Sequence, residues 1–173
     1  MKNVDVLFKI PILNFSIENF KFKQKQIEKV LKQYPEHRLN GPFFSNRGQM
    51  DVSFMHTFSD IFKKEFEYIS KNLQSNAVLK DIWSNSYKKG DYHIPHNHGS
   101  RGYTGILYLR YDDNHHPPTI YFQPWNDVRD VGRFEVPEVK EGSVVIFPSF
   151  VQHMSRPNPI SKYKRIISFD LNV

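Results

Sequence analysis

Short β-rich runs, separated by clusters of turn residues, fill the chain from residue 82 to its end. The runs are IWSNSY, YTGILYLRY, PTIYFQP, SVVIFPS and KRIISFDLNV, and the segments between them include KKGD, DDNHHPP and EGS. Short strands between Gly, Pro, Asn and Asp clusters are typical of an all-β sandwich or barrel. The sequence therefore predicts a jelly-roll-like double sheet over residues 81–173.

The residues before position 80 show helical periodicity. A first helix is predicted between Ser16, as its cap, and Pro35, which cannot continue a helix. Its apolar stripe consists of Phe20, Ile27, Val30, Leu31 and Tyr34. A second helix is predicted with Asp60 in its first turn, where an acidic side chain complements the helix dipole. Its apolar stripe consists of Phe58, Ile61, Phe62, Phe66, Ile69 and Leu73.

Both helices need a partner for their apolar faces, and the sheet is the available one. A chain of 173 residues has room for one sizeable core. We therefore expect a single domain over residues 1–173 that is mainly β. Residues 1–80 are predicted to form a helical N-terminal support packed on one sheet, and residues 81–173 the β-core.

Cysteine is absent from the chain. This excludes disulfides, thiolate nucleophiles and cysteine-based zinc or iron–sulfur sites. Any metal must therefore be held by histidine or carboxylate side chains. The net charge of +6 is carried largely by lysines spread over the predicted helices, without an arginine–aromatic stripe, so nucleic acid is not an expected partner.

No run reaches the roughly 18 apolar residues of a membrane helix, and the first residues lack the apolar block of a signal peptide. We expect a soluble cytoplasmic protein with no membrane partner.

Histidines gather in one part of the sequence, since five of the eight fall between residues 93 and 116. His96 and His98 stand at i and i+2, and on an extended segment such residues point to the same face. His93 has the opposite parity and is kept as a residue that supports the site without binding the metal. His115 and His116 lie in a predicted turn and are expected to be exposed.

A third metal ligand is suggested by EGSVVIFPSFVQHMSRPN, in which a buried strand leads through a turn to His153. Three side chains on one side of an ion leave the opposite positions open for substrate and oxygen, as a non-heme iron site requires. Imidazole suits iron, zinc, copper and nickel, so the type of ligand alone does not select the metal.

The segment SYKKGDYHIPHNH, with Tyr87, Gly90, Tyr92, His96 and His98, resembles the Y-x-x-G-x-x-Y-x-x-H-x-D signature of the prolyl 4-hydroxylase branch of the 2-oxoglutarate and iron(II) dependent oxygenases. The strand TGILYLRYDD is similar to T-x-L-x-Y-L-N of that branch. EGSVVIFPS is similar to its G-x-A-V-x-F strand before the distal histidine. The motifs occur in the same order, and the resemblance spans roughly residues 83–173.

A closer resemblance is to a group of small bacterial and phage 2-oxoglutarate and iron(II) oxygenases that share the N-terminal helices. Their core reads approximately H-x-H-P-x-S, S-G-V-Y-Y, G-x-L-V-x-F-P-S and H-x-V-x-P-N with a following Arg. The corresponding segments here are HNHGS, TGILY, GSVVIFPS and HMSRPN.

This resemblance implies a double-stranded β-helix, the jelly-roll or cupin-like fold, and a non-heme dioxygenase that hydroxylates its substrate. It implies that His96, His98 and His153 bind Fe(II) and that Arg165 pairs with the C5 carboxylate of 2-oxoglutarate. Tyr108 and Tyr87 match tyrosines near that cosubstrate. The implied partners are 2-oxoglutarate, O2 and a primary substrate that is a protein or a small molecule. Because the chain is compact, an exposed polypeptide side chain is the leading expectation.

The orientation of the cosubstrate residues follows from strand parity. Arg165 alternates with an apolar set that we expect to face the barrel interior, namely Ile167, Phe169 and Leu171, while Lys164 has the opposite parity. Thr104, Ile106 and Tyr108 share one face and are expected to line that interior. Four further aromatic residues are expected in the wall or core: Trp83, Tyr103, Tyr121 and Trp125.

Two positions depart from the family pattern. His98 stands where the hydroxylase branch carries Asp, which leaves the iron site one charge unit more positive. Ile167 stands where many relatives carry Ser or Thr, and Ser168 is one step out of register. Two alternatives stay open: a three-histidine enzyme that does not use 2-oxoglutarate, either a cupin-type dioxygenase or a zinc hydrolase, and a non-catalytic metal-binding barrel.

Overall fold

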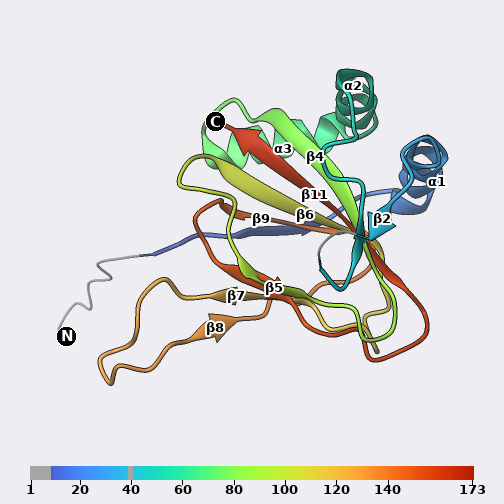
Figure 1. Cartoon of the computed structure of the whole chain (residues 1–173). Helices are drawn as coiled ribbons and strands as arrows, with labels where there is room; N and C mark the ends of the chain where they lie inside the picture. Colours follow the sequence, from blue (N-terminus) through green and yellow to red (C-terminus); the bar gives the residue numbers. More distant parts are fainter. Residues whose placement is uncertain (1–8, 39–40) are drawn as a thin grey trace.

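A computed structural model describes residues 9–38 and 41–173 of the chain. Two antiparallel β-sheets face each other, and three helices lie on the outer side of the larger sheet (Figure 1). The expected fold class, mainly β with helices packed on one sheet, is confirmed. None of the described helices is long and apolar enough to cross a membrane.

The larger sheet has seven strands in the order β1-β9-β6-β11-β4-β3-β2. Their bounds are β1 Leu13–Ser16, β2 His37–Arg38, β3 Phe44–Ser45, β4 Val78–Tyr87, β6 Tyr103–Arg110, β9 Ser143–Pro148 and β11 Lys164–Asn172. The smaller sheet has the order β5-β10-β7-β8. Its strands are β5 His93–His96, β7 Thr119–Phe122, β8 Phe134–Glu135 and β10 His153–Ser155.

From β4 onward the chain passes repeatedly from one sheet to the other. The larger sheet takes β4, β6, β9 and β11, and the smaller one takes β5, β7, β8 and β10. This path is that of a double-stranded β-helix. The first 80 residues are more than a helical support, because β1 pairs with β9 and β3 pairs with β4 at the two sides of the larger sheet.

The helices are α1 Phe20–Leu31, α2 Val52–Ile61 and α3 Lys63–Leu73. The second predicted helix is thus two helices, and its predicted start near Asp60 was wrong. Helix α2 begins after Asp51, whose carboxylate accepts a hydrogen bond of 2.8 Å from the Phe54 N–H and so caps the helix. Ser16 is not a cap either, since it lies in β1 and α1 begins after Asn19.

The break between α2 and α3 could not be predicted from the spacing of apolar residues. Phe62, at the break, still donates its N–H to the Phe58 carbonyl at 3.0 Å, and both rings are buried. The i, i+4 spacing of apolar residues therefore continues through the break.

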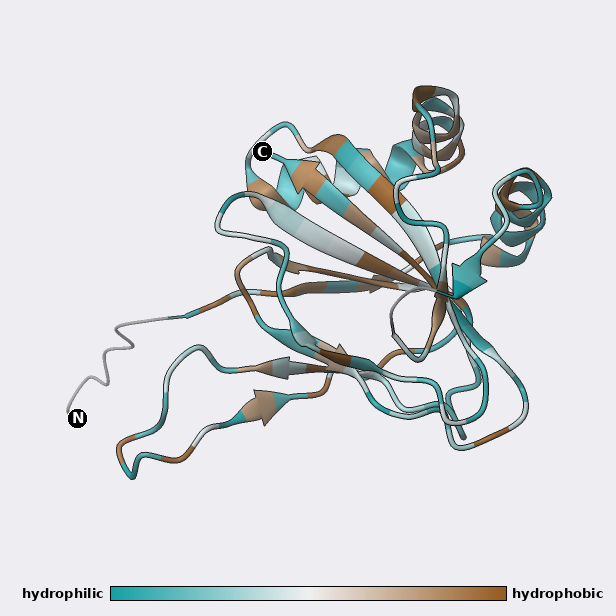
Figure 2. Ribbon diagram, viewed as in Figure 1, coloured by the Kyte–Doolittle hydropathy of each residue, from teal (hydrophilic) through white to brown (hydrophobic). Residues whose placement is uncertain are grey.

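Two hydrophobic clusters lie on opposite faces of the larger sheet. The outer cluster joins the helices to residues such as Leu107, Ile167 and Phe169, and Figure 2 shows hydrophobic residues on both the helices and these strands. The inner cluster lies between the two sheets and includes Tyr87, Tyr108, Tyr121 and Ile166, among others. Alternate residues of one strand thus serve different cores.

Gly105 leaves the space that the Phe169 ring occupies. A Cβ atom at position 105 would lie 2.1 Å from the ring. We expect Gly105→Ala to lower the free energy of unfolding by about 1–3 kcal/mol, the usual cost of overpacking a core, measured by urea denaturation. Gly132→Ala is the matched control, because its Cβ would meet the Asn126 Oδ1 at an ordinary 3.5 Å. Equal urea midpoints for both variants would contradict this packing account.

Candidate metal centre

His96 and His153 are placed opposite each other by the pairing of β5 with β10. The two residues are direct partners in the antiparallel register. Directly opposed residues of neighbouring strands present their side chains on the same face. Their imidazole centroids are 4.3 Å apart, so strand pairing alone brings these two rings together.

His98 lies in the segment after β5, outside any strand, and is held by other contacts. Its backbone N–H donates to the Ser149 carbonyl at 2.9 Å. Its ring stacks on Trp83 at 5.3 Å between centroids, and its Nδ1 lies 2.7 Å from Asp170 Oδ1. Backbone and side chain are therefore fixed by residues at the end of β9 and on β4 and β11.

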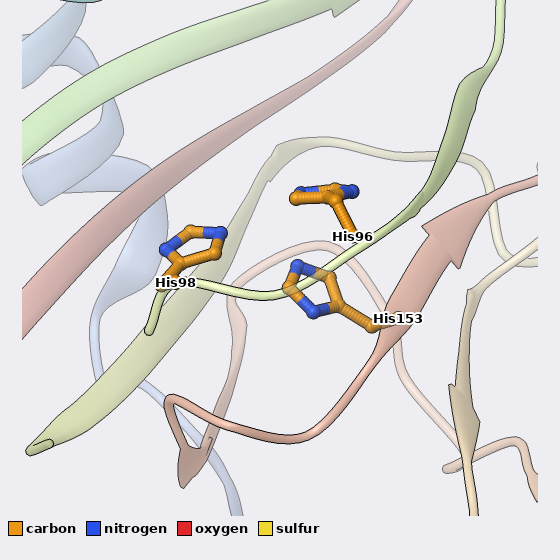
Figure 3. A group of neighbouring side chains, drawn as sticks. All are labelled: His96, His98 and His153. Carbon is orange, nitrogen blue, oxygen red and sulfur yellow. The ribbon is translucent and has the colours of Figure 1, made fainter. Parts of the chain in front are cut away.

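The three imidazoles point toward one another across a small space (Figure 3). His98 lies 5.4 Å from His96 and 5.1 Å from His153 between ring centroids. One ring nitrogen from each histidine can be chosen so that all three lie within 4.8 Å of one another. The structure thus brings together the three histidines expected from the sequence.

The hydrogen bonds of the three rings define which nitrogen is free. His96 Nδ1 lies 2.8 Å from the Ile94 carbonyl oxygen, and His153 Nδ1 lies 3.2 Å from the Val151 carbonyl oxygen. His98 Nδ1 faces Asp170, as described above. A carbonyl oxygen or a carboxylate can only accept, so each Nδ1 carries the proton and donates. Each Nε2 therefore keeps a free lone pair for a metal ion.

Burial keeps His153 and His96 neutral. It lowers the pKa of His153 well below its usual value, and the neighbouring His96 and His98 lower it further. The pKa of His96 is also lowered, chiefly by burial. Neutral imidazole is the form that binds a metal. Three neutral nitrogen donors within reach of one ion fit a divalent transition metal, iron included.

A cavity of about 180 Å³ adjoins the three histidines. Both sheets contribute to its wall, through Phe43, Ser45, Arg47, Trp83, Asn85, Tyr87, His93, His96, His98, Ile106, Thr119, His153, Ser155, Ile166 and Ser168. Arg47 is exposed, and its guanidinium lies 4.4 Å above the centre of the Trp83 ring. No carboxylate lines the cavity within the ranges described, so its wall is neutral or positive.

His93 belongs to the cavity wall rather than to the three converging histidines. Its ring stacks on His96 at 3.8 Å between centroids, and burial lowers its pKa to about 3. It therefore supports the His96 ring from the side. His115 is exposed as expected, but His116 is 3% exposed and accepts a hydrogen bond from the Asp112 N–H at Nδ1. The expectation of an exposed His116 was wrong, because this ring fills the inside of its own turn.

Tyr87 and Tyr108 are both fully buried between the sheets, and burial raises the pKa of each hydroxyl. Tyr87 lines the cavity, and the Tyr108 hydroxyl accepts from the Thr119 N–H at 3.3 Å. The neighbouring Tyr121 hydroxyl is buried without a hydrogen-bond partner in the described part of the chain. An unsatisfied hydroxyl of this kind is costly unless a ligand or water completes it.

Arg165 lies on the outer face of β11. Its Nε donates to Ser86 Oγ at 2.8 Å and its guanidinium pairs with Glu36 at 3.2 Å. It is not among the residues that line the cavity. The expected inward orientation of Arg165 was therefore wrong.

The inward-facing cation is its neighbour, Lys164. The Lys164 side chain is completely buried, and its ammonium donates to Ser155 Oγ at 2.6 Å and to the Pro117 carbonyl at 3.2 Å. It lies 4.8 Å from the centre of the Tyr87 ring. Ser155 and Tyr87 both line the cavity, so the ammonium stands directly behind its wall.

The sequence analysis assigned the wrong face of β11 to the barrel interior. Ile167, Phe169 and Leu171 do share a face, but they pack against the helices. Three polar residues of the strand, Lys164, Ser168 and Asp170, have the other parity, and two of them were missed as site residues: Lys164 and Asp170. Three buried or half-buried polar residues of one parity on an otherwise largely apolar strand are the signal that could have located the face with the site.

Comparison with known proteins agrees with this geometry. A model of the family described as "Putative 2OG-Fe(II) oxygenase" matches residues 81–170. The match covers more than half of the 173-residue chain. The chain therefore belongs to this family, whose members are iron(II) and 2-oxoglutarate dependent oxygenases. A search of curated proteins gave no significant match.

Solved structures share the fold at low sequence identity. HygX from Streptomyces hygroscopicus, solved with nickel, 2-oxoglutarate and hygromycin B, aligns with a TM-score of 0.70 and 9% identity over 94% of this chain and 83% of its own. A prolyl-4-hydroxylase from Pseudomonas putida gives 0.61 and 13% over 95% and 94%. The epimerase SnoN of nogalamycin biosynthesis gives 0.73 and 7% over 94% and 77%. At these identities the likeness establishes the double-stranded β-helix.

Family and fold together confirm the activity expected from the sequence. The protein is an oxygenase that uses iron(II), 2-oxoglutarate and O2. Membership of this family favours the 2-oxoglutarate dependent oxygenase over the zinc hydrolase, the cupin-type dioxygenase without 2-oxoglutarate and the non-catalytic barrel.

Proposed function

We propose that His96, His98 and His153 bind the catalytic iron(II) through their Nε2 atoms. The observation that carries this assignment is the set of three Nδ1 atoms that each face an oxygen acceptor, at 2.8, 2.7 and 3.2 Å. Three lone pairs are thereby directed to a common space within 4.8 Å. This preorganisation holds the ligands in their binding tautomer before any ion arrives.

Lys164, in place of Arg165, is proposed to bind the far carboxylate of 2-oxoglutarate. Its buried ammonium has neutral oxygens as its hydrogen-bond partners, which leaves a positive charge uncompensated between the sheets. The buried Tyr121 hydroxyl without a partner adds a donor in the same inner cluster. Arg165 already has its carboxylate in Glu36. Tyr87 is proposed to form the wall beside this carboxylate, and Tyr108 to position Thr119 in the same wall.

When bound, iron and 2-oxoglutarate supply the oxidant that hydroxylates a C–H bond, with succinate and carbon dioxide as co-products. The chain itself contributes three neutral nitrogen ligands, a buried cation and a wall that keeps water away. Trp83 and Phe43 provide apolar surface beside the histidines. A water-poor site strengthens the pairing of Lys164 with a carboxylate.

We propose that the primary substrate is an exposed polypeptide side chain, with an acidic group nearby. The cavity of about 180 Å³ is smaller than the roughly 300–1,000 Å³ of pockets that enclose a drug-sized ligand. It therefore suits the cosubstrate, while the substrate reaches the metal from outside. At the rim, the exposed Arg47 guanidinium on Trp83 favours an anionic neighbour of the reacting group. The expected cytoplasmic location stays a prediction.

A peptide screen tests the substrate class. We expect acidic peptides to stimulate succinate formation from 2-oxoglutarate and to gain one oxygen atom by mass spectrometry. Arg47→Gln should raise the KM for such peptides about tenfold or more, since a charge-assisted hydrogen bond contributes about 1.5–3 kcal/mol, and should leave kcat nearly unchanged. Lys88→Gln, which removes an exposed lysine outside the cavity wall, is the control. Stimulation by small molecules alone would refute the polypeptide assignment.

A further inference from the structure

The hydrogen-bond partners of the three Nδ1 atoms differ in charge. His96 and His153 each donate Nδ1–H to a neutral backbone carbonyl. His98 donates to a carboxylate, Asp170, at 2.7 Å. The His98 side chain is 3% exposed and the Asp170 side chain 13%, so solvent screens this contact weakly. Among the described residues, the one anion hydrogen-bonded to the three histidines thus stands behind His98.

Asp170 is itself held in place. Thr104 Oγ1 donates to Asp170 Oδ1 at 2.9 Å and lies 3.1 Å from Ser149 Oγ. The Ser149 carbonyl accepts from the His98 backbone N–H at 2.9 Å. Together with the His98–Asp170 contact, these bonds close a ring that runs from His98 through Asp170 on β11, Thr104 on β6 and Ser149 after β9 back to the His98 backbone. The carboxylate therefore has a fixed orientation relative to the imidazole.

We infer that Asp170 is a positioning residue that supplies the metal centre with the negative charge that His98 does not carry. The hydroxylase branch that the sequence resembles has an aspartate as the ligand at the position of His98. Here the ligand is neutral, and the carboxylate lies one imidazole further out. A carboxylate that accepts a proton-bearing Nδ1 raises the electron density at Nε2 and strengthens the metal bond. The ligands together with Asp170 then have the same net charge as two histidines and one aspartate.

This inference rests on the proposed role of His98 as a ligand. It explains how a histidine can replace the usual anionic ligand. The negative charge stays close to the metal on the Asp170 carboxylate, although this carboxylate does not bind the metal itself. It also gives Asp170 a role that backbone structure alone does not require, since its carboxylate contacts His98 and Thr104 through side chains only.

The test is the metal affinity of Asp170→Asn, measured by titrating the metal-free protein with Co²⁺ and recording the absorption of the bound ion. Asparagine keeps the size and an acceptor oxygen but removes the charge. We expect affinity to fall by about 10–100-fold, the usual effect of altering an outer-shell partner, and the Co²⁺ absorption bands to shift. Thr104→Val, which removes a hydrogen bond but leaves the charge, should have a smaller effect on affinity.

Asp81→Asn is the matched control, because Asp81 is the register partner of Asp170 on β4 and its carboxylate accepts from the Ile82 N–H. It makes the same charge change without contact to an imidazole. The thermal midpoint of each metal-free variant is measured first, so that a folding defect is recognised. If the wild type binds Co²⁺ and Asp170→Asn binds it with equal affinity and spectrum, the inference is overturned. An equal loss in Asp81→Asn also overturns it. Failure of the wild type to bind Co²⁺ would instead refute the metal site itself.

Discussion

The His153→Ala variant is expected to form no succinate from 2-oxoglutarate under air with added iron(II). His153 is buried as a whole residue, and it is the partner of His96 in the strand register. Its removal leaves two nitrogen donors for the ion. Because altering an outer-shell partner already costs about 10–100-fold in metal affinity or activity, loss of a direct ligand should exceed that range. Succinate formation and iron(II) affinity are measured together.

His115→Ala is the control for this experiment. It removes a histidine whose side chain is 60% exposed and which hydrogen-bonds to Asp112 in a turn. It should keep wild-type turnover. Removal of a buried ring leaves a cavity that destabilises the fold. His153→Gln fills more of this space than His153→Ala, so turnover of both variants is compared. Turnover in either His153 variant at the wild-type rate would refute its assignment as a ligand.

Lys164→Met should raise the dissociation constant for 2-oxoglutarate by roughly 100- to 4,000-fold. Removing one partner of a buried ion pair costs about 3–5 kcal/mol, and each 1.4 kcal/mol corresponds to about a factor of ten. Methionine keeps most of the side-chain length and apolar character, so the interior stays filled. Binding is measured by calorimetry with a redox-inert metal in the absence of oxygen.

Arg165→Met is the decisive comparison. Arg165 pairs with Glu36 on the outer face, so its loss should affect 2-oxoglutarate binding little, although it leaves the Glu36 carboxylate without its guanidinium. The metal-free thermal midpoint separates that effect on stability from an effect on binding. The opposite result, with Arg165→Met weakening binding and Lys164→Met leaving it intact, would restore the role that the family resemblance gave to the arginine.

The pH dependence of 2-oxoglutarate binding provides a second readout for Lys164. Burial lowers the pKa of the Lys164 ammonium to about 7 from its usual 10.5. Between these values the folded protein holds fewer protons than the unfolded chain, so the stability of the metal-free protein should rise with pH across this window. Affinity for the dianion should instead fall as pH rises through about 7, because the cation is lost. Lys164→Arg, which stays charged, should abolish this fall.

The sequence alone predicted those features that depend on residues close together in the chain. The i, i+2 spacing of His96 and His98 and the turn before His153 predicted three converging histidines, and the structure brings them together. The turn clusters from residue 82 onward predicted the double sheet for the same reason, since turn residues act on the backbone beside them.

The residues that sequence reasoning placed wrongly depend on contacts between distant segments. Alternation along β11 shows which residues share a face, but not which face the helices cover. Arg165 was assigned to the interior because its face is the more apolar one, and that face is buried under the helices instead. The carboxylate of Asp170 meets His98 across 72 positions of sequence, so no local pattern could reveal the pair.

The two faces of strand β11 have different roles, because one packs against the helices and the other faces the space between the sheets. On β11, Ile167, Phe169 and Leu171 pack against the helices. On the other face, Ser168 lines the cavity, and Lys164 and Asp170 hydrogen-bond to residues of its wall. Substitutions at Ile167, Phe169 and Leu171 should therefore act mainly on folding, and substitutions at Lys164, Ser168 and Asp170 mainly on chemistry. An engineer could vary Lys164, Ser168 and Asp170 to change the cosubstrate or metal, while keeping the helix-facing residues and Ile166, which belongs to the inner hydrophobic cluster.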